Sequence, residues 1–572
     1  MEWLLAKQIR PFVKLAGFAS LLLNFALLAP ALYMLQVFDR VFSSGSVETL
    51  VMLGIPVFVM LVFGYCMDAA RARTLAAAGR RLEQCMAPEA LATQLERRAA
   101  GVSRDDDALR DVARLRGQLA GPGVVALFDA PWVPLYLLVI TLMHPLLGAI
   151  AVIGGLLLLA LGVFTERATR RDTERARDAT RAAQRQADAL LRNSEVVVAM
   201  GMAGAALGAW SECRDRQHEA QQRVAHTGAR LAALARVSRQ GLQVVALAIG
   251  AWLVIGRHAS PGIMIATTIL LGRALQPVEL LIAGWKAMIE ARAAWRRLGE
   301  FELRVRESRL ELPTPKGRLD VEHLSYAVRD RTLLRGVSFA AHPGEVVAIV
   351  GPSASGKTTL LRLLTGVRAP QAGKVRLDGA DIARWDRENL GRAIGYLPQD
   401  VELFDGSISS NIARLQTPDP QAVIRAAQSA HAHDLILRLP DGYDTHIGEG
   451  GCLLSAGQRQ RIALARALYG APRLVILDEP NANLDDEGDA ALAAALVELK
   501  ARGATVIVVT HRRSLISRVD RIAILRDGKI ETFGPSATVL ARLAEAARVL
   551  PFPAAQPRQA DSLKANAEQA TA

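Results

Sequence analysis

The first half of the chain alternates long apolar blocks with long charged stretches, whereas the second half has short apolar runs separated by polar turns. Six blocks approach the about 20 residues that a bilayer requires, and they predict membrane-spanning helices. These helices are expected at about 14–38, 50–67, 124–143, 145–165, 242–256 and 262–285. The whole pattern predicts a membrane domain over 1–305, a linker over 306–318, an α/β domain over 319–547 and a disordered tail over 548–572.

Positive charge predicts the orientation of the spans. Segments 68–122 and 166–240 hold 24 arginines, whereas the connections 39–49 and 257–261 hold only Arg40 and Arg257. Because arginine is enriched in cytoplasmic connections, both long segments, both chain ends and the α/β domain are expected in the cytoplasm. The composition of the two long segments favours extended helices.

The overall charge does not indicate a nucleic-acid partner. The formal net charge is +13, but aromatic residues make up only 5% of the chain and no basic run is interleaved with them. Positive cytoplasmic segments that lie next to a lipid bilayer explain the excess of positive charge better than a nucleic-acid partner does. The four cysteines are far apart and lack the spacing of a metal site.

The segment "GEVVAIVGPSASGKTTLLRLL" (344–364) places an apolar strand, a glycine loop and an amphipathic helix in sequence. This order predicts an ATP-binding phosphate loop, in which glycines permit a tight path and backbone N–H groups face the phosphates. Lys357 is expected to meet the β- and γ-phosphates and Thr358 to ligate Mg²⁺. The expected nucleotide-binding residues are Gly351, Pro352, Ser353, Ala354, Ser355, Gly356, Lys357, Thr358 and Thr359.

A second acidic element is expected to complete the nucleotide site. In "RLVILDEP" (473–480), two carboxylates follow a buried strand. Asp478 suits the Mg²⁺ shell, and Glu479 suits a general base that polarises the attacking water.

In these motifs the second half resembles the nucleotide-binding domain of ABC transporters. "LLSAGQRQR" resembles the signature motif, which the family usually writes Leu-Ser-Gly-Gly-Gln, so Ala456 departs from the pattern. The resemblance implies that Ser455, Gly457 and Gln458 contact the nucleotide held by a partner chain. Six spans and one such domain imply half of an exporter, so the expected assembly is a homodimer.

Further positions are carried over from the resemblance one at a time. Gln399 in "YLPQD" matches the loop glutamine that senses Mg²⁺, and His511 in "VIVVTHR" matches the switch histidine at the γ-phosphate. Asp485 in "NANLD" matches the loop that links two nucleotide sites. Two alignments of "SYAVRDR" place either Tyr326 or Val328 against adenine, and Tyr326 is favoured.

Five strings resemble the permease/ATPase of bacterial type I secretion systems, in the protease and lipase exporter branch: "YMLQVFDRV", "FDAPWVPLYL", "RNSEVVVAMGM", "YLPQDVELFDG" and "LDEPNANLD". That resemblance implies an inner-membrane protein that exports unfolded polypeptides carrying a C-terminal signal. It also implies two partners, a periplasmic adaptor and an outer-membrane channel. An exporter or flippase of lipids or small hydrophobic molecules shares every ATP motif and stays open as the alternative, as does an ATP-gated channel.

Overall fold

The computed structural model describes residues 2–101, 108–302, 312–328, 331–482, 484 and 486–549. Contacts divide the chain into two compact units, one of residues 1–95 and 103–306 and the other of residues 96–102 and 307–572. Most of the expected disordered tail, and Asp485 of the expected nucleotide site, lie outside the described residues.

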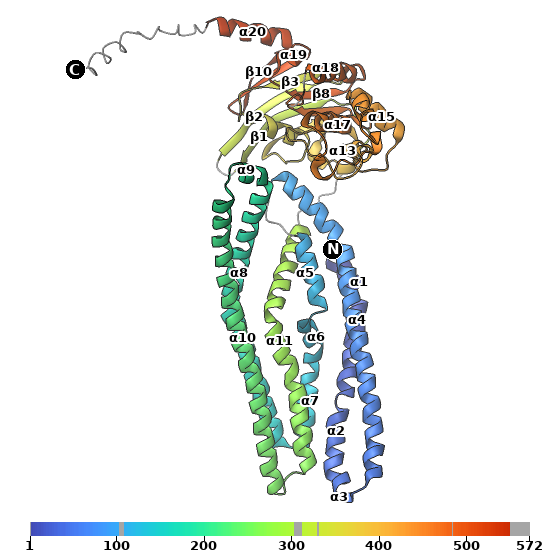
Figure 1. The fold of residues 1–572 in the computed structure, drawn as a ribbon, viewed down its shortest axis with the longest axis vertical. Coiled ribbons are helices and arrows are strands. Elements are labelled where there is room, and N and C mark those ends of the chain that lie inside the picture. Colours follow the sequence, from blue (N-terminus) through green and yellow to red (C-terminus); the bar gives the residue numbers. More distant parts are fainter. Residues whose placement is uncertain are drawn as a thin grey trace, which may run out of the picture. The chain divides into compact units, whose positions relative to one another are not determined.

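The first unit is built from helices. Its long members are α4 (Val47–Ala100), α8 (Pro145–Arg192), α10 (Ala203–Ile255) and α11 (Pro261–Glu302). The shorter members are α1 (Glu2–Ala26), α2 (Ala29–Gln36), η1 (Val37–Val41), α3 (Phe42–Ser44), α5 (Ala108–Leu119), α6 (Pro122–Asp129), η2 (Ala130–Trp132), α7 (Val133–Met143) and α9 (Ser194–Ala199). Helices α8 and α10 pack along each other and are joined through α9 (Figure 1).

Six helical segments of the described chain are long and apolar enough to cross a membrane, in agreement with the six expected spans. They are Gln8–Ser44, Val47–Ala100, Pro122–Met143, Pro145–Arg192, Ala203–Ile255 and Pro261–Trp285. Three of them continue far beyond the about 30 Å of a hydrocarbon core, because 48 to 54 residues at about 1.5 Å each exceed that thickness.

Two spans change helix type within their length. The first passes from α2 into a π-helical turn, η1, and the third passes from α6 through the short 3-10 segment η2 into α7. Pro131 lies inside η2, where its missing N–H interrupts the regular hydrogen-bond ladder. Such turns are common where a helix serves a function, because they redirect side chains.

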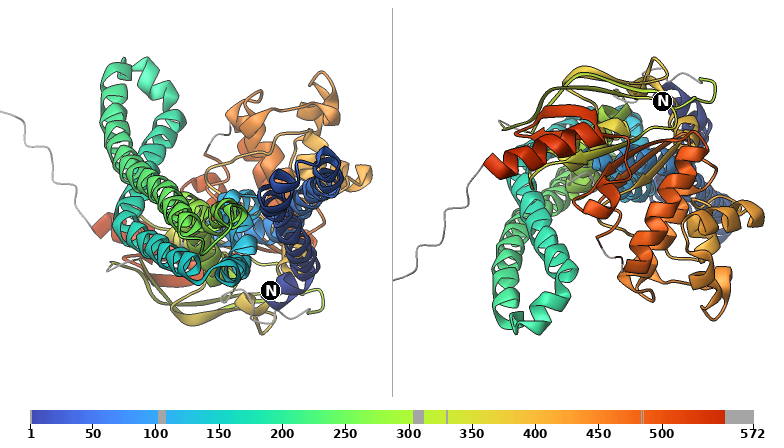
Figure 2. Two further views of the ribbon diagram at one scale, coloured as in Figure 1. Left: turned by 90° about the horizontal axis from the view of Figure 1, so that it is seen from below. Right: turned by 90° about the horizontal axis from the view of Figure 1, so that it is seen from above.

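Helix α11 lies at the centre of the first unit, in contact with α2, α5, α6, α7, α8 and α10. Seen along the helices, α1 and α4 lie on one side of this unit and α8 and α10 on the other (Figure 2). Small and aliphatic residues fill the centre, among them Ala274 and Leu275 of α11 and Leu158 of α8.

The second unit contains two sheets. The antiparallel sheet has the order β2-β1-β4-β5, and the larger sheet has the order β10-β9-β3-β8-β7-β6. In the larger sheet only β10 runs antiparallel to its neighbour. The strands are β1 (Leu319–Val328), β2 (Arg331–Ala341), β3 (Val346–Val350), β4 (Ala372–Leu377), β5 (Ala380–Asp381), β6 (Ile394–Leu397), β7 (Leu474–Asp478), β8 (Thr505–Val509), β9 (Arg521–Arg526) and β10 (Lys529–Pro535).

Helices and short turns complete this unit. They are α12 (Lys357–Leu364), η3 (Ile382–Arg384), α13 (Arg387–Ala393), α14 (Ile408–Ile412), α15 (Pro420–Ser429), α16 (His433–Leu437), η4 (Gly442–Asp444), η5 (Glu449–Gly451), α17 (Ala456–Leu468), α18 (Asp486–Ala501), α19 (Arg513–Ile516) and α20 (Ser536–Val549).

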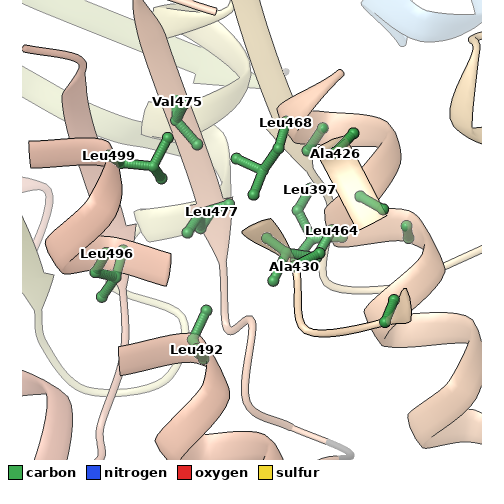
Figure 3. Close-up of a cluster of buried hydrophobic side chains, with 14 of the residues drawn as sticks. Leu397, Ala426, Ala430, Leu464, Leu468, Val475, Leu477, Leu492, Leu496 and Leu499 are labelled. Atoms are coloured by element: carbon green, nitrogen blue, oxygen red, sulfur yellow. The ribbon is translucent and has the colours of Figure 1, made fainter. Parts of the chain in front are cut away.

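The parallel strands are mainly apolar because both faces of the sheet are covered. Along β7, Val475 and Leu477 enter one core, whereas Leu474 and Ile476 enter the other, as a period of two requires. Figure 3 shows the first core, in which side chains of β6, β7, α15, α17 and α18 meet. This double packing fixes the strand ends, from which the candidate site is built.

Candidate nucleotide site

The expected catalytic and phosphate-binding residues follow neighbouring parallel strands. The phosphate loop follows β3, Gln399 follows β6, Asp478 ends β7 and His511 follows β8. Because β3, β8, β7 and β6 are adjacent and parallel, their carboxyl ends share one edge of the sheet. The sheet therefore brings together residues that are more than a hundred positions apart in the sequence.

The phosphate loop has the tight backbone that its glycines predict. Gly356 has φ of +100° and Ala354 has φ of +64°. A Cβ on Gly351 would lie 2.1 Å from the Leu525 carbonyl oxygen, so this position has no room for a side chain. Lys357 is buried, and its Nζ donates to the carbonyl oxygens of Gly351 at 2.8 Å and Pro352 at 3.0 Å. The lysine thus lies across the loop whose phosphates it is expected to meet.

Unsatisfied polar atoms in the loop and the acidic strand fit a bound nucleotide and its metal. Ser355 Oγ, in the loop, and Asp478 Oδ2, at the end of β7, are buried and have no hydrogen-bond partner within the described residues. An orphaned buried oxygen costs free energy unless a ligand satisfies it. Carboxylate and hydroxyl oxygens are also the donors that Mg²⁺ prefers, so the residues fit both groups.

Asp478 lies in an environment that opposes its charge. It is 1% exposed, and burial raises the pKa of its carboxyl above the ordinary value. The nearby Glu479 charge raises this pKa further, whereas a hydrogen bond from Thr358 lowers it. The positive charges of Arg362 and Lys357 also lower it. A divalent cation would relieve the unfavourable burial of this carboxylate.

The side chain of Glu479 lies close to two other candidate catalytic residues, Gln399 and His511. Its Oε2 accepts a hydrogen bond from Gln399 Nε2 at 3.4 Å, and its Oε1 lies 3.7 Å from His511 Nε2. Its side chain is 29% exposed, so it can reach water, unlike Asp478 beside it. Glu479 has φ of +47°, which is uncommon for a residue with a Cβ and typical of functional turns. Its backbone N–H holds that turn by donating to the Val509 carbonyl oxygen at 3.0 Å.

The signature residues begin helix α17. Ser455 caps it: its Oγ accepts from Gln458 N at 3.2 Å, and Gln458 Oε1 accepts from Ser455 N at 2.9 Å. This reciprocal pair is a capping box, which satisfies two of the free N–H groups of the first turn. Ser455 and Ala456 are exposed, and no hydrogen bond within the described chain joins Ser455, Gly457 or Gln458 to the phosphate loop.

A residue that the motifs do not single out connects the signature helix to the acidic strand. Gln460 is 1% exposed, and its Nε2 donates to the Pro480 carbonyl oxygen at 2.9 Å. Further along the same loop, Asn481 accepts from Thr510 Oγ1 at 3.4 Å. A buried amide on an otherwise apolar helix face is the sequence signal that could have identified Gln460.

Tyr326 and Val328 lie near the end of strand β1. The Tyr326 ring is partly buried against the antiparallel sheet's core, and the Arg368 guanidinium carbon lies 5.9 Å from its centroid. Val328 is exposed. Tyr326 therefore has an aromatic face already covered on one side by a cation.

Comparison with known proteins agrees with this geometry. The model of the ABC transporter family matches residues 334–482, and the model of the ABC transporter transmembrane region matches residues 109–278. The type I secretion system ATP-binding protein PrsD of Rhizobium meliloti is 42% identical over 92% of both chains. The cyclolysin secretion/processing ATP-binding protein CyaB of Bordetella pertussis is 37% identical over 51% of this chain and 42% of its own length.

A solved structure of a bacterial Atm1-family ABC exporter with ATP bound has the same fold, with a TM-score of 0.82 over 96% of this chain and 99% of that chain. Its sequence identity is 23%. The two matched domains, the six spans and the extended identity to PrsD lead to one conclusion. The chain belongs to the ABC transporters, as a type I secretion system ATP-binding protein, and is a multi-pass inner-membrane exporter with ATPase activity.

Proposed function

We propose that this exporter hydrolyses ATP with Glu479 as general base and uses the energy to move an unfolded polypeptide through a homodimer. The observation that carries the catalytic assignment is the meeting of Glu479 with Gln399 and His511 at the end of adjacent strands. Carboxylates in such positions accept a proton from water, and this contribution is worth about 10²–10⁴-fold in rate.

The neighbours of Glu479 act as positioning residues in this proposal. Gln399 donates to one carboxylate oxygen, which leaves the other oxygen for a water molecule. His511 lies beside that second oxygen and is half-exposed, so it can also reach the γ-phosphate. The contacts restrict the rotamers of Glu479, and restricted orientation is itself a source of catalytic rate.

The phosphate loop would hold ATP through its backbone N–H groups, Lys357 and the start of α12. Thr358 and Asp478 would hold Mg²⁺, with Gln399 nearby, and the bound metal neutralises phosphate charge. Tyr326 would stack on adenine with the face that Arg368 leaves free.

The signature residues favour a dimer with two shared nucleotide sites. Ser455 is exposed at the start of α17, and Ser455, Gly457 and Gln458 do not bond to the chain's own phosphate loop within the described residues. We therefore assign Ser455, Gly457 and Gln458 to the nucleotide held by a second copy, and by the family resemblance we assign Asp485 to the loop that links the two nucleotide sites. Positive dipole at the N-terminus of α17 would add to the attraction for phosphate.

The polypeptide cargo rests on relatives that export proteins. PrsD is named as a type I secretion protein, and relatives from Mannheimia haemolytica are named for leukotoxin translocation. We propose that the exporter works with a periplasmic adaptor and an outer-membrane channel and recognises a C-terminal signal. Its chain ends and nucleotide-binding domain would be cytoplasmic, an orientation that the arginine-rich segments favour.

Deletion of the gene, followed by comparison of culture-medium proteins, tests the cargo. We expect one or a few proteins to disappear, to return with the wild-type chain and to stay absent with Glu479→Gln. Glu388→Gln is the matched control, because Glu388 is an exposed residue of α13 outside the site. An unchanged set of secreted proteins, together with ATPase activity stimulated by lipids or drugs, would instead support a lipid or small-molecule exporter.

A further inference from the structure

A polar cavity of about 290 Å³ lies among α1, α4, α6, α7 and α11 of the membrane unit. Its lining includes Asn24, Asp68, Arg71, Asp129 and Arg273, together with apolar residues of the same helices. Four of these side chains are ionisable. Asp129 and Arg273 lie within the expected spans 124–143 and 262–285, and Asp68 and Arg71 directly follow the expected span 50–67 on the same helix, α4. Ionisable groups in spans are costly to retain and commonly mark a transport pathway or binding site.

Three of the four charges form a fixed network on one side of the cavity. Arg71 is buried, and its guanidinium lies 2.6 Å from an oxygen of Asp129 and 2.6 Å from an oxygen of Asp68. Asn24 also donates to Asp129 at 3.0 Å, and Tyr136 donates its hydroxyl to Asn24 Oδ1 at 3.0 Å. Two carboxylates thus share one arginine, and the hydrogen bonds that orient Asp129 come from α1 and α4.

Arg273 of α11 is the remaining charge. Within the described residues it forms no ion pair, and its one hydrogen bond is long, from Nη1 to Gln276 Oε1 at 3.5 Å. Gln276 also lines the cavity and is exposed. The guanidinium therefore has several donors free for a ligand, in a fork that matches the two oxygens of a carboxylate.

We propose that this cavity binds carboxylate groups of the polypeptide during export, with Arg273 as the cation that holds them. The inference rests on the proposed polypeptide cargo. The volume of the cavity corresponds to about ten water molecules at roughly 30 Å³ each. The cavity therefore admits a few side chains of an extended polypeptide but no folded domain. Asp68 and Asp129 disfavour a second negative charge, so one carboxylate fits better than a phosphate dianion.

The test uses the full chain in nanodiscs of phosphatidylcholine and two labelled peptides, one of alternating Asp and Gly and one of alternating Asn and Gly. Fluorescence anisotropy measures their binding. For Arg273→Gln we expect the Asp peptide to bind about tenfold more weakly, as loss of a charge-assisted pair predicts, while binding of the Asn peptide stays unchanged. Arg273→Lys should retain most of the affinity for the Asp peptide, because it keeps the charge.

Arg296→Gln is the matched control, because it removes the same charge from an exposed position about 35 Å along α11. It should bind both peptides as the wild type does. Thermal unfolding and size-exclusion chromatography of each variant establish that the protein is folded and that its assembly is retained.

Several outcomes would overturn the proposal. If Arg273→Gln and the wild type bind the Asp peptide equally well, the cavity does not bind carboxylates through Arg273. The proposed export of polypeptides would not be affected by this result. Loss of the dimer in Arg273→Gln would assign the cation to the subunit interface. If added phosphatidylglycerol displaces the Asp peptide from the wild type in a way that depends on Arg273, the Arg273 side chain would be assigned to lipid binding. A wild-type protein that binds neither peptide would contradict this proposal, whereas the polypeptide cargo is decided separately by the comparison of culture-medium proteins.

Discussion

Glu479→Gln separates nucleotide binding from hydrolysis. The change keeps the size of the side chain, and the amide oxygen can still accept from Gln399, which lies 3.4 Å away. It removes the only property that a general base requires, an ionised oxygen that takes a proton. Removal of a general base lowers the rate about 10²–10⁴-fold, equivalent to about 2.7–5.5 kcal/mol in the activation free energy.

The structure indicates that this loss would not come from unfolding. Glu479 is 29% exposed and lies among polar groups, so an isosteric change should alter the free energy of unfolding by less than about 1 kcal/mol. The phosphate loop is unchanged, and ATP affinity should therefore stay within about threefold of the wild type.

The assay is phosphate release by the full chain in nanodiscs, with binding of a fluorescent ATP analogue measured in parallel. Glu388→Gln makes the same chemical change at an exposed site on α13 and should behave as the wild type. Phosphate release by Glu479→Gln within about threefold of the wild-type rate would refute the assignment of Glu479 as base.

Two further predictions concern the same edge of the sheet. Gln460→Leu should lower stability by about 1–3 kcal/mol, because it leaves the Pro480 carbonyl oxygen without its donor, and an unchanged unfolding midpoint would contradict this. Asp478→Asn should raise the unfolding midpoint of the nucleotide-free protein at pH 8. The raised pKa of Asp478 gives the wild type a stability that is present in acid and lost as pH rises. The difference between the two unfolding midpoints should therefore narrow as pH falls from 8 towards 3.8, the ordinary pKa of an aspartate, and a difference independent of pH would oppose this.

Residues that follow strands could be predicted from the sequence, because each lies in a local pattern with a direct physical meaning. The phosphate loop follows an apolar strand and precedes a helix, and Asp478 and Glu479 end a second apolar strand. The prediction of roles for Gln399 and His511 also required the family resemblance, since a single glutamine or histidine in a sequence indicates little about function. Parallel strand order then explains why these four segments meet.

Contacts between distant polar residues could not be predicted in this way. Arg71 and Asp129 are separated by 58 positions, and neither lies in a motif that names the other as its partner. Asp129 stands in the string "FDAPWVPLYL" beside Pro131, a pattern that indicates no partner for its carboxylate, and the structure places it in the network that lines the cavity. The π-helical and 3-10 turns inside two spans could not be predicted either, because hydropathy indicates the length of an apolar block and not its local hydrogen bonding.

Helix α17 joins the two kinds of nucleotide contact in the proposed dimer. Ser455 and Gln460 are five residues apart, which is about 7.5 Å along the helix and about 140° around it, so they face nearly opposite directions. The exposed Ser455 end would meet the partner's nucleotide, while the buried Gln460 side holds Pro480, directly after Glu479. A shift of α17 on closure would therefore move the backbone beside the chain's own catalytic base. In the proposed dimer the string "LLSAGQRQRIALARALYGAPRLVILDEP" would contribute to two nucleotide sites, and the buried hydrogen bond from Gln460 to Pro480 would connect them.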